Sequence, residues 1–237
     1  SLKIIVREED VFMLKTWIPE EIPEKEELKK RIKEAGEKLY QQQMKLKEHK
    51  LPVLVLFEGW GASGKGTTIG RVIKYIDPRF FKVATMSKPT EDELRRPFLY
   101  RYFNQIPEAG KFTFLDSGWM EQTCNDCLNG LEEEDYAKRI DSIKHFERQL
   151  TDNGYLVLKF FMQIDKKEQE KRFRQRQENP EKQWKITEED WRNREKWEQY
   201  EEAVNEMLIR TSTEYAPWIV VEGNDKYYAR LKVLETV

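Results

Sequence analysis

The sequence predicts an α/β protein, a three-layer sandwich in which about five parallel strands form one sheet between two layers of helices. Short apolar runs alternate along the chain with longer segments whose apolar residues recur every three or four positions. The short runs are continuously apolar, as in parallel strands that are covered on both faces. A chain of 237 residues is long enough for one such domain with a substantial core.

Five apolar runs are the expected strands, at residues 53–57, 81–85, 112–115, 156–161 and 218–221. Before them, residues 24–50 form a charged helix whose apolar positions make one stripe, which consists of Leu28, Ile32, Ala35, Leu39 and Leu46. We expect residues 1–50 to be an N-terminal extension with a helical arm, packed on a main domain of residues 51–237. Ligands bind at the carboxyl ends of parallel strands, so functional motifs should follow the strands.

The overall charge names no partner, because 42 Lys and Arg balance 44 Asp and Glu to a net charge of −2. We therefore expect no nucleic-acid partner. The chain has no long apolar run and no signal peptide, which predicts a cytoplasmic protein without a membrane partner. Ser1 in place of Met suggests a fragment of a longer chain. Cys124 and Cys127 have too few companions for a zinc site. Their spacing also suits a redox pair, but without a thioredoxin-like context we expect ordinary thiols one helical turn apart.

The motif "GWGASGK" at residues 59–65 fits G-x-x-x-x-G-K and lies between the first expected strand and a helix. Such a loop turns its N–H groups toward phosphate, and its lysine adds a mobile cation. The alternative is a tight turn with a chance lysine. The residue after Lys65 is Gly66, so a magnesium-binding hydroxyl must come from Thr67 or be replaced by water. The expected phosphate ligands are Gly59, Gly61, Ser63, Gly64, Lys65, Gly66 and Thr67.

A second motif, "FTFLDSGWM", places Asp116 at the end of the third expected strand. A carboxylate there can hold Mg²⁺ or orient the attacking oxygen beside the phosphate loop. The alternative is an aspartate that caps the turn before Gly118. We favour the catalytic interpretation.

Two basic series extend the pattern, and they consist of Arg95, Arg96 and Arg101 on one expected helical segment and of Lys171, Arg172, Arg174 and Arg176. Charge runs are usually solvated, but phosphoryl transfer needs cations that reach the phosphates, often from a mobile segment. We expect a lid around residues 170–190. Thr187 and Asp190 have capping-box spacing before a long amphipathic helix. Three aromatic side chains nearby are expected to pack rather than to stack on bases: Trp191, Trp197 and Tyr200.

From about residue 51 to residue 237 the chain resembles the family-2 polyphosphate kinases. The resemblance rests on the segments "FEGWGASGKG", "DPRFFKV", "PTEDELRRP", "YRYF", "LDSGWM", "WKITEEDWRNREKW" and "RTSTEYAPWIVVEGNDKYYARLKVL". It implies the P-loop kinase fold, Mg²⁺-dependent phosphate transfer between inorganic polyphosphate and nucleotides, and a homo-oligomer. It further implies Lys65 on the transferred phosphate, Asp116 on magnesium and the accepting phosphate, and the following supporting residues: Arg172 and Arg176 in the lid, Asp190 and Arg194 after it, and Lys88 and Arg101 in a polyphosphate channel.

The chain departs from the family pattern at two places. The family usually has Asp where this chain has Gly61, and Asp-Arg-Ser-Trp-Tyr where residues 116–120 read Asp-Ser-Gly-Trp-Met. An acid and a cation are thus missing from the expected site. Three functions stay open: polyphosphate-dependent transfer to AMP or ADP, an ATP-dependent nucleoside monophosphate kinase, and a catalytically reduced half that binds its ligands beside an active partner.

Overall fold

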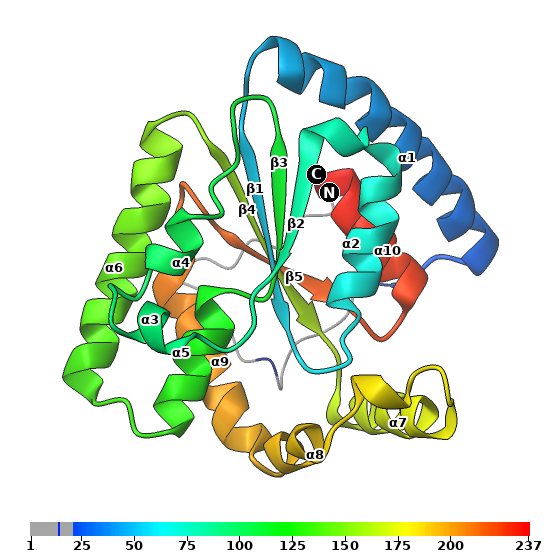
Figure 1. Cartoon of the computed structure of the whole chain (residues 1–237). Helices are drawn as coiled ribbons and strands as arrows, with labels where there is room; N and C mark the ends of the chain where they lie inside the picture. Colours follow the sequence, from blue (N-terminus) through cyan, green and yellow to red (C-terminus); the bar gives the residue numbers. More distant parts are fainter. Residues whose placement is uncertain (1–13, 15–20) are drawn as a thin grey trace.

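A computed structural model describes residue 14 and residues 21–237, and it confirms the predicted three-layer α/β sandwich (Figure 1). The five predicted strands are all present, as β1 (Val53–Gly59), β2 (Phe81–Thr85), β3 (Phe112–Asp116), β4 (Leu156–Gln163) and β5 (Trp218–Glu222). They form one parallel sheet in the order β2-β3-β1-β4-β5. Four strands run one or two residues further than predicted, so that Gly59 and Asp116 are themselves strand residues.

The helices lie on both faces of this sheet and across one end of it (Figure 1). Their bounds are α1 (Lys25–Glu48), α2 (Lys65–Val72), α3 (Glu91–Leu94), α4 (Tyr100–Phe103), α5 (Trp119–Leu128), α6 (Glu133–Asp152), α7 (Lys166–Glu178), α8 (Glu188–Glu195), α9 (Trp197–Thr211) and α10 (Lys226–Thr236). Three short 3-10 helices, η2 (Ile73–Tyr75), η3 (Pro78–Phe80) and η4 (Gln183–Lys185), complete the described elements. None of the described helices is long and apolar enough to cross a membrane.

Strand β1 shows how the sheet divides the core into two clusters. All seven of its residues are buried. Leu54 and Leu56 face the cluster formed with α5, α6 and α9, whereas Val55 and Phe57 face the cluster formed with α1, α2 and α10. This alternation follows from the two-residue period of a strand, and burial on both faces explains why the run is apolar throughout.

The predicted helical arm is α1, and it belongs to the second of these clusters. Leu28, Ala35 and Leu39 of the predicted stripe are buried there, with Ile32 and Leu46 packed against them. Figure 1 shows α1 running alongside α10. Arg31 of α1 also donates to Glu235 of α10 at 2.8 Å. The arm therefore contributes part of the helical layer that covers α10 and the sheet.

Two helix predictions were wrong. Arg95, Arg96 and Arg101 do not share one helix, because the chain breaks between α3 and α4 at Pro97, which has no N–H to continue the helical bonding. The expected long helix after Thr187 is also broken, at Lys196, into α8 and α9. The break lets α8 lie at the end of the sheet while α9 packs in the core.

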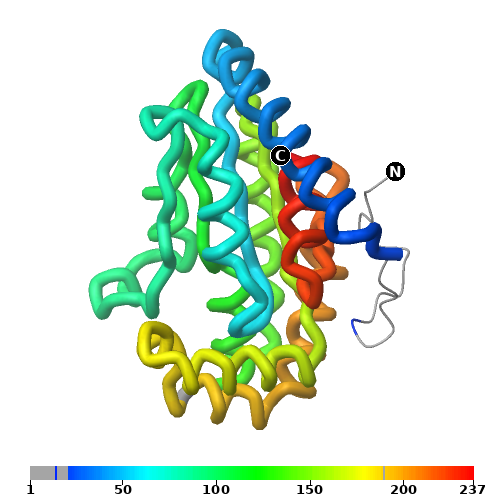
Figure 2. The backbone as a smooth tube through the Cα atoms, turned by 90° about the vertical axis from the view of Figure 1, so that its right-hand side faces the viewer, coloured from blue at the N-terminus to red at the C-terminus, as the bar shows by residue number. Residues whose placement is uncertain are grey.

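The predicted lid lies within residues 166–195, which comprise α7, η4 and α8 and are called the lid segment below. Figure 2 shows this segment lying across the end of the sheet at which β1 leads into α2. The capping box at the start of α8 is confirmed, because Thr187 Oγ1 accepts from the Asp190 N–H and Asp190 Oδ2 accepts from the Thr187 N–H. Cys124 and Cys127 lie one turn apart on α5, and both are free thiols.

Candidate active site

The loop between β1 and α2 has the conformation of a phosphate loop. Gly59 has φ +142°, and a Cβ there would lie 2.5 Å from the Met162 carbonyl oxygen of β4. Gly64 has φ +98° and precedes the first residue of α2. Both glycines are therefore required by the backbone. The loop closes through a hydrogen bond from Ser63 N–H to Trp60 C=O at 3.0 Å, which leaves it wrapped around the start of α2.

Gly61 is under no such constraint. Its φ is not in the left-handed region, and a Cβ there would meet only ordinary contacts, the nearest at 3.5 Å from Phe173. The position at which the family usually carries Asp is thus open to a side chain, so its glycine is a difference in chemistry rather than in backbone shape. Ser117, at the other departure, has φ +67°.

The Lys65 ammonium group is folded back onto its own loop. Its Nζ donates to the Gly59 carbonyl at 3.0 Å and to the Trp60 carbonyl at 3.5 Å. Neutral carbonyls are weaker partners for a cation than phosphate oxygens are. A bound phosphate can therefore draw Lys65 from this resting position.

Asp116 ends β3 directly beside the loop. Its Oδ2 lies only 3.0 Å from the position of a Cβ on Gly66, in the first turn of α2. Burial raises the pKa of the Asp116 carboxyl, Lys65 opposes this rise, and the neighbouring Glu121 adds to it. The carboxylate accepts no hydrogen bond from any residue that the structure describes, so the turn-capping alternative gains no support.

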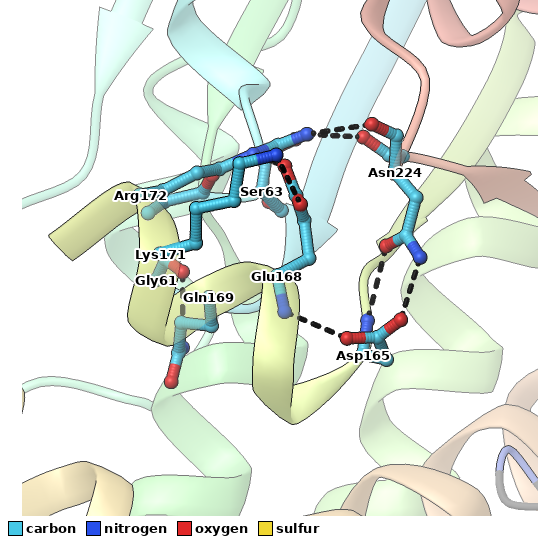
Figure 3. A network of polar contacts seen from close by, with 10 residues as sticks. Gly61, Ser63, Asp165, Glu168, Gln169, Lys171, Arg172 and Asn224 are labelled. Carbon is cyan, nitrogen blue, oxygen red and sulfur yellow. Dashed lines mark hydrogen bonds and ion pairs between the residues drawn. The ribbon is translucent and has the colours of Figure 1, made fainter. Parts of the chain in front are cut away.

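The two predicted lid arginines differ sharply in their contacts. Figure 3 shows the Arg172 guanidinium between the phosphate loop and the loop after β5. It donates to the carbonyls of Ala62 at 3.0 Å and Gly223 at 2.7 Å, and more weakly to the next residues, Ser63 and Asn224. Its Nε bonds Glu168 at 2.8 Å. Arg172 is therefore a clamp on the outer side of the loop.

Arg176, one turn further along α7, donates no hydrogen bond to another described residue. Burial lowers the pKa of its guanidinium, Asp190 opposes this, and the neighbouring Arg172 adds to it. A half-buried arginine with unused donors is suited to bind an anion.

A chain of side-chain contacts joins α8 to the loop. Arg194 donates to Glu170 at 2.9 Å and to Gln169 Oε1 at 3.2 Å, and Gln169 Nε2 donates to the Gly61 carbonyl at 3.0 Å. The predicted residues Gly61 and Arg194 are thus connected through Gln169, a residue that the sequence did not single out. Arg194 positions the lid segment on the loop rather than offering a free cation.

Trp60 anchors the loop from within. Its ring stacks on Trp197 of α9 with a centroid distance of 3.7 Å and an interplanar angle of 5°. Its Nε1 donates to Gln163 at 2.6 Å, and Tyr200 packs against it at 5.4 Å. Trp191 packs edge-on against Phe173 of α7. The predicted packing of Trp191, Trp197 and Tyr200 is confirmed.

Two spaces border different residues of the phosphate loop. The first, called the basic groove, has a volume of about 580 Å³ and passes Ser63, Gly64 and Thr67 of the loop. Eight basic and two acidic side chains line it: Lys25, Lys171, Arg172, Arg176, Lys182, Lys185, Lys226 and Arg230 with Glu168 and Asp225. The Ser63 hydroxyl beside it is buried and has no hydrogen-bond partner among the described residues.

The second space, called the acceptor cavity, lies between α5 and the lid segment. Its larger part, of about 490 Å³, is lined by Lys88, Arg101, Ser117 and Asp190 among others. A smaller part, of about 150 Å³, reaches the loop at Gly59, Gly61 and Lys65 and is also lined by Arg194. Four residues line both parts, so the two parts are neighbours: Glu121, Asn125, Asp190 and Asn193.

The structure thus divides the predicted residues between these spaces. Ser63, Gly64 and Thr67 meet the lid arginines in the basic groove, while Asp190 and Arg194 meet Lys65 in the acceptor cavity. Lys88 and Arg101, which were predicted to extend a polyphosphate channel, line the larger part of the second space, and Arg101 Nη2 donates to the Ser87 carbonyl.

The sequence-based prediction did not include Glu58, directly before the loop motif, or Trp60, within it. An acidic residue at the end of an apolar strand was the available signal for Glu58. No sequence signal was available for Gln169, because a glutamine within a charged helix looks like any other solvent-exposed residue.

A sheet of five parallel strands whose central strand leads through a phosphate loop into a helix defines a P-loop protein of the kinase class. The sequence model of one family, polyphosphate kinase 2, matches residues 22–237. The chain belongs to this family.

Its curated relatives carry related names. It is 44% identical over 194 residues to the polyphosphate:AMP phosphotransferase of Pseudomonas syringae pv. tomato, covering 81% of this chain and 39% of that protein. It is 37% identical over 202 residues to the AMP/ADP-polyphosphate phosphotransferase of Meiothermus ruber, covering 85% and 73%. The chain therefore spans well under half of the first of these relatives.

Solved structures agree with the family assignment. The crystal structure of a putative polyphosphate kinase 2 from Pseudomonas aeruginosa superposes with a TM-score of 0.89 at 38% identity, over 94% of this chain and 48% of that one. The polyphosphate kinase 2 from Arthrobacter aurescens gives 0.91 at 30% identity, over 94% and 83%.

Proposed function

We propose that this chain transfers the terminal phosphoryl group of inorganic polyphosphate to AMP or ADP, reversibly and with Mg²⁺. The basic groove carries the proposal. It begins at the phosphate loop and continues past α7 and η4 of the lid segment to Lys226 and Arg230 of α10. A row of cations beyond the loop suits an extended polyanion, whereas a single nucleoside triphosphate needs cations only near the loop itself.

The acceptor cavity supplies the second substrate site. Its two neighbouring parts are lined by Lys88 and Arg101 at one end and by Lys65 at the other, so a nucleotide with its phosphate directed to the loop would meet cations at both ends. Its relatives' names, polyphosphate:AMP and AMP/ADP-polyphosphate phosphotransferase, support AMP or ADP as the acceptor.

The phosphoryl group would then pass across the loop, from the groove to the cavity. Lys65 lies at this crossing and neutralises charge on the transferred group once it leaves its resting carbonyls. Asp116, directly beside the loop, orients the accepting phosphate oxygen. Arg176 adds a cation from the lid, while Arg172 and Gln169 hold the loop carbonyls so that the N–H groups face the phosphates.

The residues at the crossing suit magnesium. Mg²⁺ prefers oxygen ligands and is usually held by one or two carboxylates together with substrate phosphates. Asp116 offers a carboxylate against the first turn of α2, and the Thr67 hydroxyl lies one residue beyond Gly66. The described residues contain no cluster of three or more acidic, histidine or cysteine ligands. We expect Asp116 and Thr67 to hold an ion that arrives with the phosphates and neutralises part of their charge.

A donor-choice assay tests the proposal. The purified protein is incubated with Mg²⁺ and AMP or ADP, with polyphosphate or ATP as the only donor, and the nucleotide products are separated. Product formed from polyphosphate supports the proposal. Product formed only from ATP would make the chain a nucleoside monophosphate kinase. Binding of polyphosphate without turnover would instead show that the missing groups at Gly61 and Ser117 leave a binding half.

A further inference from the structure

Glu58 lies in the core of the site, and the proposed mechanism does not use its carboxyl group. It is the last residue but one of β1, and only 1% of its surface is exposed. Its Oε1 accepts the backbone N–H of Met120 at 3.0 Å and of Glu121 at 3.3 Å. Its Oε2 is buried and has no hydrogen-bond partner among the described residues.

The two N–H groups belong to the first turn of α5, where a helix has donors with no partner of its own. Gly118 occupies the capping position and has no side chain with which to accept them. A Cβ on Gly118 would lie 2.5 Å from Leu56 Cδ1 and 3.3 Å from Glu58 Oε1. The glycine therefore admits Glu58, and the capping oxygen comes from a strand 60 residues earlier rather than from the helix's own N-cap.

This contact bears on Asp116 because only Ser117 and Gly118 separate it from α5. At one end of this link Asp116 is paired with Phe57 of β1, and the Ser117 N–H donates to the Phe57 carbonyl at 2.9 Å. At the other end the start of α5 is held by Glu58. One strand, β1, thus carries the phosphate loop and fixes both ends of the turn that presents Asp116.

We propose that Glu58 is a positioning residue: by accepting the Met120 and Glu121 N–H groups it fixes the turn that places Asp116 against the phosphate loop. The catalytic part of this inference rests on the proposed function, whereas the capping contact does not. What matters for capping is an oxygen acceptor at Oε1, which a glutamine supplies equally well. The burial of Glu58 and the nearby Glu121 raise the pKa of its carboxyl to about 8, which agrees with a group that serves in its neutral form.

Two variants separate the acceptor from the charge. Glu58→Gln keeps an oxygen acceptor, and Glu58→Leu removes it at similar size. Val55→Ala is the matched control, because it weakens the same strand on its opposite face without touching α5. For each protein we would measure kcat and KM with polyphosphate and nucleotide, together with hydrogen exchange of the Met120 and Glu121 amides.

Glu58→Leu should lower kcat by about tenfold or more, since a small displacement of a reacting group is costly, and leave the KM for polyphosphate within about twofold. Exchange of the two amides should accelerate in this variant. Glu58→Gln and Val55→Ala should keep both properties within about threefold of the starting protein. Unchanged kcat or unchanged exchange in Glu58→Leu would overturn the proposal, as would equal losses in the two Glu58 variants. If the starting protein transfers no phosphate, the proposed function fails, and amide exchange alone decides whether Glu58 caps α5.

Discussion

Lys65 is the residue on which the proposed chemistry depends most directly. Among the described residues it donates hydrogen bonds only to two carbonyls of its own loop, so we expect it to contribute little to the fold. We predict that Lys65→Ala lowers turnover by about a hundredfold or more, because it removes charge stabilisation from the transferred phosphate. The melting temperature should stay nearly unchanged. Lys74→Ala, which removes an exposed lysine just beyond α2, is the control and should keep full activity. Activity of Lys65→Ala within a few-fold of normal would refute the role of the loop.

The raised pKa of Glu58 predicts how the stability of the protein depends on pH. Burial first, and then Glu121, raise the pKa of its carboxyl to about 8 from an ordinary value of 4.5, while Lys65 opposes the rise. The other titratable groups that it faces are Tyr102, Cys124 and Tyr200. Between these two pKa values the folded protein keeps a proton that the unfolded chain releases. The contribution of protonated Glu58 to stability is therefore complete below pH 4.5 and is lost as the pH rises through about 8.

Glu58→Gln removes this dependence, because the amide does not titrate. The melting temperature of the starting protein should therefore fall relative to that of Glu58→Gln between pH 5 and pH 8. Thermal unfolding of both proteins across this range measures the difference. Two parallel curves would mean that Glu58 is not held in its neutral form.

At the scale of elements, helix α7 carries two arginines one turn apart that differ in their contacts. Arg172 makes five contacts with the loop, with Glu168 and with the turn after β5. Arg176 has no hydrogen-bonding partner among the described residues and lines the basic groove. The sequence alone gives both the same role, but the structure predicts that their alanine variants differ.

Arg176→Ala should leave the melting temperature unchanged and reduce the slope of log affinity for polyphosphate against log salt by about one, the expected loss of one phosphate contact. Arg172→Ala should instead destabilise the protein by at least about 1.5 kcal/mol, because hydrogen bonds to a charged group are lost. Binding titrations at several salt concentrations, with thermal unfolding, give both quantities. Equal effects of the two variants would contradict the division of roles.

At the scale of the whole molecule, the sequence was sufficient to locate the strands, the phosphate loop and Asp116. The five apolar runs are visible because a strand covered on both faces must be apolar along its length. The loop and Asp116 are visible because their chemistry needs particular residue types directly after strands. Helix ends were harder, and the break at Pro97 was a signal in the sequence that the prediction did not use.

Three other features of the structure have no local sequence pattern from which they could be predicted. The strand order β2-β3-β1-β4-β5 depends on where each crossover returns, and nothing in a single strand records this. Arg172 bonds backbone carbonyls, which every residue possesses, so its role as a clamp cannot be seen in the sequence. Glu58 caps a helix that begins about 60 residues later, and only the fold brings the two together.

The central claim is that the two substrates bind on opposite sides of the phosphate loop. A pair of matched variants tests it: Lys226→Ala removes an exposed lysine from the basic groove, and Lys88→Ala removes one from the acceptor cavity. The measurement is the KM for polyphosphate and for AMP or ADP in each variant. We predict that Lys226→Ala raises only the KM for polyphosphate and that Lys88→Ala raises only the KM for the nucleotide. If both variants raise the same KM, or if the two effects are exchanged, the substrates do not bind on the two sides that we propose.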